Sequence, residues 1–522
     1  MTAGRLPPLL LATVALIALA AVLPLAYLVV VVGAEAGEWA RTVLSGRAVG
    51  LLARSVALAA AVTLTAVAIA VPLAWLTVRT DLPGRRAWSV LCALPLVIPS
   101  YIGAYLLVSA LGPRGELQGL LEGPLGVERL PALYGFGGAW LALSLFCFPY
   151  VLLPAQAVLR GLDPSLEEAA RGMGRSGWAT FRDVVAPQLA PAVAAGALLV
   201  ALYALSDFGA VAIMRFDSFT RAIYQSYRSS FDRVGAASLA TLLVLVTLVV
   251  LWLEARTRRA GALHRSAPGV ARAPRPVPLG RWRLPALALC AVVVGTSLVL
   301  PVAMLALWTT RSVAGSVAWA QVAEAAGHSL LAAALAAGVA ALCAVPVALL
   351  AARHPGRATS ALEGAAYAGH ALPGVVVALA LVFFATRALP ALYQTLATLV
   401  AALVILFLPQ AVGAARAAIL QVPPRLEEAA RSLGRSPLRA FATVTAPLAG
   451  GGVLAGGALV FLTAVKELPA TLILAPIGFD TLATEVWRAS SVGFYERGAV
   501  PSLVLLAVSA VPLAVLVLRG RT

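Results

Sequence analysis

Three ionisable side chains lie inside apolar stretches of the sequence, where a charge is costly. Asp207 and Glu467 each interrupt an apolar run, and Lys466, the only lysine of the chain, precedes Glu467. In a membrane such groups face a cavity or a charged partner, and carboxylate oxygens suit hard cations. The sequence leaves two interpretations open: these residues line a substrate path, or they form a structural pair such as Glu467 with Lys466.

The two carboxylates occupy corresponding places, 260 residues apart, and each is followed by a helix-breaking residue. Gly209 stands two residues after Asp207, and Pro469 two residues after Glu467. A helix break frees backbone groups, which a membrane protein tolerates only against protein or water. A permanently tight metal site would oppose release of a cargo, so we expect no metal ligands here. The cysteines and histidines are dispersed, so we also expect no catalytic residues.

A second polar feature occurs twice and is the clearest signal in the chain. The sequence reads LEEAARGMGRSGWATFRDVVAP over residues 166–187 and LEEAARSLGRSPLRAFATVTAP over residues 426–447. In each copy, Glu-Ala-Ala is followed four residues later by Gly and thirteen residues after that by Pro. Each copy is an arginine-bearing island between long apolar runs. Duplication of the whole spacing argues against two ordinary loops.

Each island carries the signals of a short helix with a sharp end. Pro164 follows an aspartate and Pro424 follows another proline, and proline is favoured at the first helical position. Gly174 and Gly434 permit the positive φ that ends a helix. We therefore predict two helix–turn units that lie flat under a membrane and seat in clefts of a soluble partner.

The composition requires lipid as the solvent. Hydrophobic residues make up 61% of the chain and charged residues 12%, whereas soluble domains are about a quarter charged. The formal charge of +17 comes from arginines scattered between apolar runs, without a dense basic stretch. This distribution is typical of charges that set membrane topology, and we expect no nucleic-acid partner.

Twelve apolar runs are long enough to cross a bilayer, which needs roughly 20 residues each. They begin near Leu9, Val49, Trp88, Leu133, Pro187, Val234, Leu284, Ser329, Leu362, Ala391, Leu448 and Val500. Alternating sides from a cytosolic N-terminus places 25 arginines inside and 13 outside. The positive-inside rule thus predicts that both termini and both islands are cytosolic.

The chain is an internal duplication of two six-helix halves. Early positions correspond at 274 residues, as in Pro99 and Pro373, and later ones at 260, so the first half has a 14-residue insertion, placed at residues 112–131 outside the membrane. We divide the chain into a first helix and outer loop at 1–48, a membrane domain at 49–253, a basic Pro-rich cytosolic linker at 254–283, a seventh helix and outer loop at 284–323, and a second membrane domain at 324–519. Two parallel repeats predict a path between them.

The duplicated islands resemble the EAA signature of the permeases of ABC importers of the type I fold, over nearly the whole chain. This resemblance implies an all-α integral membrane protein of about 12 transmembrane helices. It also implies that the EAA residues contact the ATPase, namely Glu168, Ala169, Ala170, Gly174, Glu428, Ala429, Ala430 and Gly434. Val184 and Val444 stand where that family often has isoleucine.

The segments SDFGAVAIMRFDSFTRAIYQ and KELPATLILAPIGFDTLATEVW resemble those of ferric-iron importer permeases. The resemblance implies a multi-pass protein of the bacterial inner membrane, two copies of a cytosolic ABC ATPase that bind ATP and magnesium, and an extracytoplasmic substrate-binding protein. This chain has no phosphate-binding GxxxxGK[ST] loop and is expected to be neither an enzyme nor a cofactor carrier. Thiamine, a polyamine or an oxyanion as cargo, a secondary transporter and a membrane enzyme are the alternatives.

Overall fold

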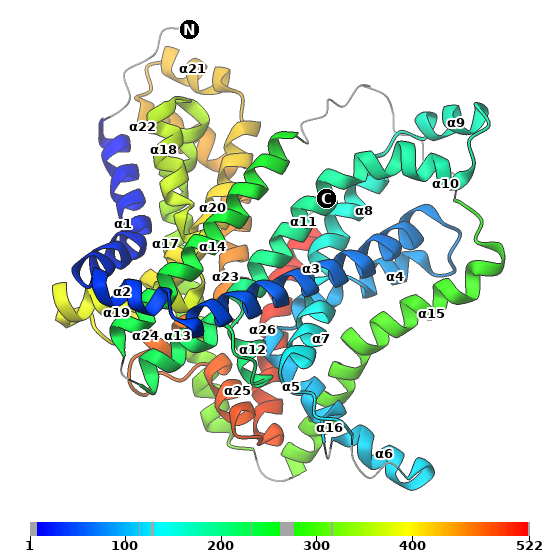
Figure 1. The fold of residues 1–522 in the computed structure, drawn as a ribbon. Helices are drawn as coiled ribbons and strands as arrows, with labels where there is room; N and C mark the ends of the chain where they lie inside the picture. The colour runs from blue at the N-terminus through cyan, green and yellow to red at the C-terminus, as the bar shows by residue number, and fades with distance from the viewer. Residues whose placement is uncertain are drawn as a thin grey trace. The chain divides into compact units, whose positions relative to one another are not determined.

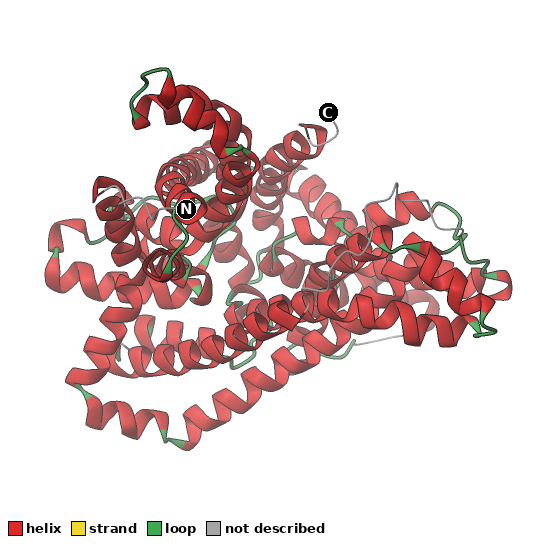
Figure 2. Ribbon diagram, turned by 90° about the horizontal axis from the view of Figure 1, so that it is seen from above, coloured by secondary structure: helices red, strands yellow, loops and turns green. Residues whose placement is uncertain are grey.

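The computed structural model describes residues 8–113, 115–126, 130–230, 232–260, 276–314 and 317–519. These ranges are helices joined by loops (Figure 2). Their one pair of bridged extended residues is Thr80 with Val277. The all-α class is therefore confirmed for this part of the chain. Half of the predicted linker, residues 261–275, lies outside the described ranges.

Nine helical segments within the described ranges are long and apolar enough to cross a membrane. Alanine and leucine, which favour helices most, dominate them, and a helix satisfies its own backbone groups in lipid. The nine are Pro8–Ala34 (α1), Gly46–Arg79 (α3), Phe136–Gly161 (α7 and α8), Gly177–Ser206 (α10, η2 and α11), Arg233–Leu253 in α14 (Arg233–Ala260), Gly280–Val313 (η3, α15, η4 and α16), Trp319–Arg353 (α17), Leu396–Gln421 (α20) and Pro437–Ala464 (α22, η7 and α23).

The other three predicted runs are also helical, and two are interrupted at corresponding prolines. Pro99 separates Arg85–Leu91 (α4) and Leu94–Val97 (η1) from Ser100–Leu111 (α5). Pro373 separates Arg357–Ala366 (α18) and Ala368–Ala371 (η5) from Gly374–Ala388 (α19), and the last run is Tyr495–Arg519 (α26). Proline lacks the N–H that would continue a helix, so each break starts a new one.

The helices form two compact units, and equivalent helices of the two halves build their cores (Figure 1). In the unit of residues 43–222 and 245–313, which we call the first unit, α3 packs against α8 (Pro149–Gly161) and α11 (Ala186–Ser206), which also pack together. In the other unit α17, α20 and α23 (Ala446–Ala464) pack in the same way. Small residues make this possible: a side chain at Gly456 would begin 3.1 Å from Ala411.

The first helix of each half belongs to the unit built by the other half. α1 contacts α17, α18 and α19, whereas α15 (Arg283–Val294), which opens the second half, contacts α3. Neither hydropathy nor repeat spacing can predict this exchange of the first helices between the two units. The domain boundaries that we placed in the sequence stay predictions.

The 14-residue insertion of the first half contains a helix, Glu116–Leu125 (α6). Glu116 pairs with Arg311 of α16 (Leu300–Ala314), with Nη2 and Oε2 3.1 Å apart. The second half has only the short turn Pro390–Leu392 (η6) in this region. The insertion is thus fastened to the helix that opens the other half.

Candidate functional site

The first island folds into two short helices joined by a tight turn, Pro164–Gly172 (α9) and Gly177–Thr180 (α10). Asp163 caps α9, because its Oδ1 accepts a hydrogen bond of 2.9 Å from the N–H of Ser165. Gly174 has a φ of +78°, a conformation that side chains disfavour. The predicted helix and its glycine stop are confirmed.

The second island repeats this construction in Pro424–Ser432 (α21) and Pro437–Ala440 (α22). Gly434 has a φ of +82°. The turn closes with a 3.2 Å bond from the N–H of Arg435 to the carbonyl of Ala430, and the first island has the same bond at the same length. From here on we call α9 and α21 the coupling helices, after the role that the resemblance predicts for them; the role itself stays a prediction.

Each island re-enters the core of its unit through one turn of π-helix, Phe181–Val185 (η2) or Phe441–Thr445 (η7). π-Helical turns are rare and are frequently found at functional sites. In the first unit the turn carries an aromatic cluster, since the ring of Phe181 stacks on Trp178 and meets Trp75 edge-on, with centroids 5.6 and 5.0 Å apart. This cluster joins α10 to the long helix α3.

The residues of each Glu-Ala-Ala triplet divide by exposure in the same way. Glu168 and Glu428 are exposed, as is the alanine that follows each. The second alanine is buried: 2% of Ala170 and 8% of Ala430 is accessible. A small side chain fits against the turn at that position, whereas the glutamate stays available to a partner. The contact between these residues and an ATPase stays a prediction.

Exposed apolar side chains accompany the glutamates, and our sequence analysis missed them. Met173 and Leu433 are 74% and 84% exposed, and Trp178 and Leu438 are 72% and 77% exposed. Leu166 and Leu426 form a third matching pair at 49% and 44%. Isolated exposed apolar residues need no explanation, but the same three positions on both islands indicate docking surfaces. The recurrence of apolar residues at matching positions in two polar stretches was the signal that could have revealed these surfaces.

Each coupling helix is held to a long helix by an ion pair that we also did not predict. Arg79, the last residue of α3, pairs with Glu167 of α9, and their side chains are 3% and 8% exposed. Arg353, the last residue of α17, pairs with Glu427 of α21 at 3.2 Å, with exposures of 12% and 23%. The hydroxyl of Thr445 donates a second hydrogen bond to Glu427.

Asp207 sits at a helix break and caps the short helix that follows, Gly209–Ile213 (α12). Its Oδ1 accepts hydrogen bonds from the N–H groups of Ala210 and Val211 at 2.9 and 3.3 Å. The hydroxyl of Ser100 donates to its Oδ2. Backbone donors freed by the break are thus satisfied by this carboxylate.

Glu467 plays the same part for Pro469–Leu474 (α24). It accepts hydrogen bonds from the N–H groups of Ala470 at 3.0 and 3.1 Å and of Thr471 at 3.1 Å. Lys466 makes no hydrogen bond or ion pair with any residue that the structure describes. The predicted pair of Glu467 with Lys466 is therefore not formed, and a substrate path lined by these residues stays a prediction.

The two caps differ in side-chain length, and the residue opposite each one compensates. Ser100 and Gly374 correspond at 274 residues. Ser100 reaches the short Asp207, whereas Gly374 leaves room for the longer Glu467: a side chain there would begin 2.5 Å from Oε1. Both halves thus hold a carboxylate at the break by different means.

In each half a short amphipathic segment follows the capped helix and begins near the end of the long helix that lies away from the coupling helix. These segments are Phe219–Arg228 (α13) and Leu482–Ser491 (α25). The N–H of Phe219 donates to the hydroxyl of Ser55 on α3 at 3.1 Å, and the N–H of Leu482 donates to that of Ser329 on α17 at 2.8 Å. The start of each segment is thus fixed to the long helix of its unit.

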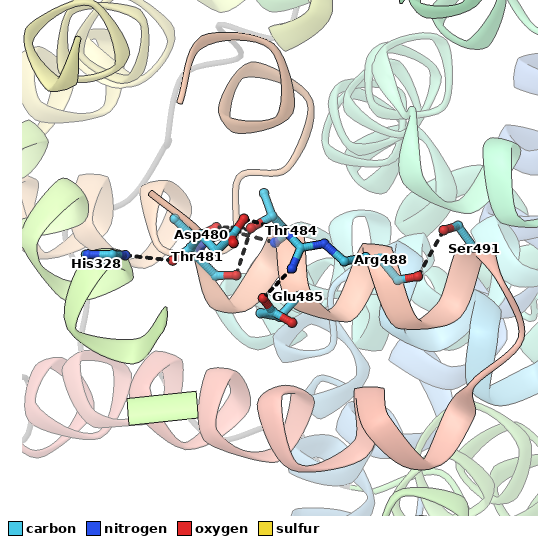
Figure 3. A network of polar contacts seen from close by, with 7 residues as sticks. All are labelled: His328, Asp480, Thr481, Thr484, Glu485, Arg488 and Ser491. Atoms are coloured by element: carbon cyan, nitrogen blue, oxygen red, sulfur yellow. Dashed lines mark hydrogen bonds and ion pairs between the residues drawn. The ribbon is translucent and has the colours of Figure 1, made fainter. Parts of the chain in front are cut away.

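A charged network covers the start of α25 (Figure 3). Arg488 binds Asp480 at 2.5 Å and Glu485 at 2.8 Å, and the ring of His328 bonds the carbonyl of Asp480 at 3.0 Å. Partial burial lowers the pKa of Arg488, but the hydrogen bond to Asp480 and both carboxylates outweigh it and raise the pKa overall. This network keeps a fixed charge pattern on an exposed surface.

Among the described residues, no group of three or more histidine, cysteine, aspartate or glutamate side chains could hold a metal ion. The four cysteines are unpaired thiols, and Cys92, Cys147 and Cys290 are buried.

Residues 66–259 and 344–520 match the family described as the binding-protein-dependent transport system inner membrane component. The Fe(3+)-transport system permease protein FbpB 2 of Haemophilus influenzae is 32% identical over 449 residues, which cover 85% of this chain and 84% of that protein. The molybdenum permease ModB of Escherichia coli is 30% identical over 36% of this chain and 86% of its own length. The sulfate permease CysT of Escherichia coli is 28% identical over 34% of this chain and 65% of its own length.

The two matched segments fall in the two halves, and each contains one island and one capped helix break. The resemblance to permeases with an internal duplication is therefore confirmed. The chain is a multi-pass integral membrane permease, and it belongs to the family of binding-protein-dependent transport system inner membrane components.

Proposed function

We propose that this permease is the membrane subunit of an ATP-driven importer that carries ferric iron into the cytoplasm by alternating access. The observation that carries the proposal is the pair of coupling helices, which expose a glutamate and apolar side chains at matching positions. The cargo is supported by the similarity to a permease named for Fe(3+) transport over 85% of the chain.

Two copies of a cytosolic ATPase would each receive one coupling helix. The exposed Glu168 and Glu428 would pair with basic groups of the ATPase, while Met173 and Leu433 would enter apolar pockets. Ala169 and Ala429 lie exposed beside the glutamates and would also contact the ATPase. The second alanine and the glycine of each island would keep the turn in the conformation that presents these side chains; they are Ala170, Ala430, Gly174 and Gly434. ATP and magnesium would bind, and ATP would be hydrolysed, on that separate subunit.

The chain would have both termini and both coupling helices in the cytoplasm of a bacterium and span its inner membrane. This orientation follows from the arginine asymmetry of the loops. α13 and α25 would then lie on the outer side, where their charged surfaces would receive a substrate-binding protein. Polar rims with fixed charges suit a transient partner because they steer encounter.

The substrate path would pass the two helix breaks. Asp207 and Glu467 would shape it, because their oxygens are already engaged by the donors of α12 and α24. Lys466, which has no partner in the described part of the chain, would supply the charge that faces the cargo. A cation there favours iron accompanied by a chelating anion over the bare ion.

An oxyanion is the second candidate cargo, for two reasons. The relatives ModB and CysT are named for molybdenum and sulfate transport. A lysine beside the path would also attract such anions. The long match to FbpB 2 favours iron, and competition between labelled ferric iron, molybdate and sulfate in one uptake assay separates the two.

Docking of the ATPase can be tested by charging its apolar surface. Met173→Glu with Leu433→Glu should abolish copurification of the ATPase subunit, because both side chains would carry a charge into an apolar pocket. Ile477→Glu is the matched control, since Ile477 is 89% exposed but lies in the loop between α24 and α25. Undiminished copurification of the double variant would refute this docking surface.

A further inference from the structure

Each ion pair at a coupling helix lies at one end of a long helix, and the other end of that helix makes a second contact. In the first unit, Glu167 of α9 pairs with Arg79 at the inner end of α3. Near the other end of the same helix, Ser55 accepts the hydrogen bond from the N–H of Phe219, where α13 begins. One continuous helix thus holds a coupling helix at one end and an outer segment at the other.

The second unit contains the same set of contacts. Glu427 of α21 pairs with Arg353 at the end of α17, and Ser329 of α17 accepts from the N–H of Leu482, where α25 begins. The 24 residues between the serine and the arginine span about 36 Å of helix at 1.5 Å per residue. Each unit thus has two contacts between residues far apart in the sequence, and the two pairs of contacts occupy equivalent places.

All of these contacts except the ion pair of the second unit are buried, so solvent cannot easily replace them. Arg79 is 3% and Ser55 is 5% exposed, and Ser329 is 2% exposed. Nη2 of Arg79 donates to Glu167, while Nε and Nη1 are buried without a hydrogen-bond partner in the described ranges, so the charge of this guanidinium depends on Glu167. A buried charge with one partner fixes the two helices to each other.

The two units differ in how firmly the inner end is held. The N–H of Val277 donates to the carbonyl of Arg79 at 2.8 Å, and the N–H of Leu279 donates to the side chain of Asp81 at 2.9 Å. The end of the linker is therefore docked beside the first ion pair. In the other unit Glu427 is 23% exposed and also accepts a hydrogen bond from the hydroxyl of Thr445.

We propose that α3 and α17 transmit the movement of the coupling helices to the outer segments, with Arg79, Glu167, Arg353 and Glu427 as inner positioning residues and Ser55 and Ser329 as outer ones. The inference rests on the proposed function, because it assumes an ATPase on the coupling helices and a binding protein on the outer segments. The first connection is the stiffer of the two, so its loss has the larger effect.

The test uses the complete complex in lipid nanodiscs, with two readouts: association of the ATPase, and stimulation of ATP hydrolysis by the loaded binding protein. Glu167→Gln and Ser55→Ala should each keep the ATPase bound and reduce this stimulation at least fivefold. The double variant should be no worse than the stronger single one, because both changes interrupt one connection. Glu427→Gln should reduce stimulation less than Glu167→Gln.

Arg311→Gln is the control, since it removes the half-exposed pair with Glu116 and should leave stimulation unchanged. Should Glu167→Gln fail to assemble, Ser55→Ala decides, because its hydroxyl lies about 36 Å of helix away from the coupling helix. Wild-type stimulation in assembled Ser55→Ala complexes would overturn the inference while leaving the proposed function intact. A wild-type chain that binds no ATPase would instead overturn the proposed function.

Discussion

Replacing Asp207 tests whether its carboxylate acts as a helix cap or as a charge toward the cargo. Asp207→Ala removes the acceptor of the N–H groups of Ala210 and Val211 and of the Ser100 hydroxyl. Asp207 is only 8% exposed, so water cannot readily replace it. A buried donor left without an acceptor costs about 1–3 kcal/mol. Three such donors give a loss of about 3 kcal/mol when each is taken at the lower limit.

Asp207→Asn separates the two roles. The amide oxygen can still accept from the backbone of α12, so only the hydrogen bond from Ser100 is lost, at about 1 kcal/mol. We therefore expect the order of stability wild type, Asn, Ala, measured as the free energy of unfolding in lipid bicelles. Uptake by the Asn variant should stay within about fivefold of wild type, because a lost hydrogen bond of about 1 kcal/mol corresponds to a factor of about five.

Two results would contradict this reasoning in different ways. An Ala variant as stable as the Asn variant would show that the cap does not stabilise the break. An Asn variant with wild-type stability but no uptake would assign the charge of Asp207 to the substrate path. Glu116→Gln serves as the control, because it removes a carboxylate from a half-exposed ion pair.

Three further predictions concern other parts of the account. Gly374→Ser should destabilise the protein by crowding Glu467, and adding Glu467→Asp should restore stability by recreating the arrangement of the first half; melting of both variants checks this, and an additive loss would contradict it. Gly174→Ala should lower the free energy of unfolding by about 1–2 kcal/mol through the positive φ alone, since open space surrounds this residue. A variant with the wild-type free energy of unfolding would contradict the role of Gly174 in ending the helix. Arg488→Gln should change the free energy of unfolding by less than about 1 kcal/mol, because this side chain is 59% exposed, yet weaken association with the binding protein, measured by light-scattering titration; unchanged affinity would remove α25 from the docking surface.

The parts of the fold set by local chemistry could be predicted from the sequence. Apolar length identified the helical runs, and the proline and glycine of each island predicted where α9 and α21 begin and end. Internal duplication then allowed each local signal to be checked against a second copy. Helix runs and helix ends depend on residues that are close in the sequence, so they can be predicted without knowledge of the tertiary contacts.

The contacts between distant residues could not be predicted. Arg79 and Glu167 are 88 residues apart, and arginine counts served only to orient the chain. For Asp207 and Glu467 the sequence left a cavity and a charged partner open, whereas their partners are mainly backbone donors freed by the breaks themselves. The exchange of α1 and α15 between units depends on packing that hydropathy does not encode.

Transport itself is the most direct test of the central claim. Labelled ferric iron would be presented to proteoliposomes that contain this chain, its ATPase and its binding protein, with and without ATP. Each run would be paired with the double variant Glu168→Ala and Glu428→Ala, which removes the exposed carboxylates of both coupling helices. We predict uptake that requires ATP and is lost in the double variant. Iron uptake that persists without ATP would contradict the account.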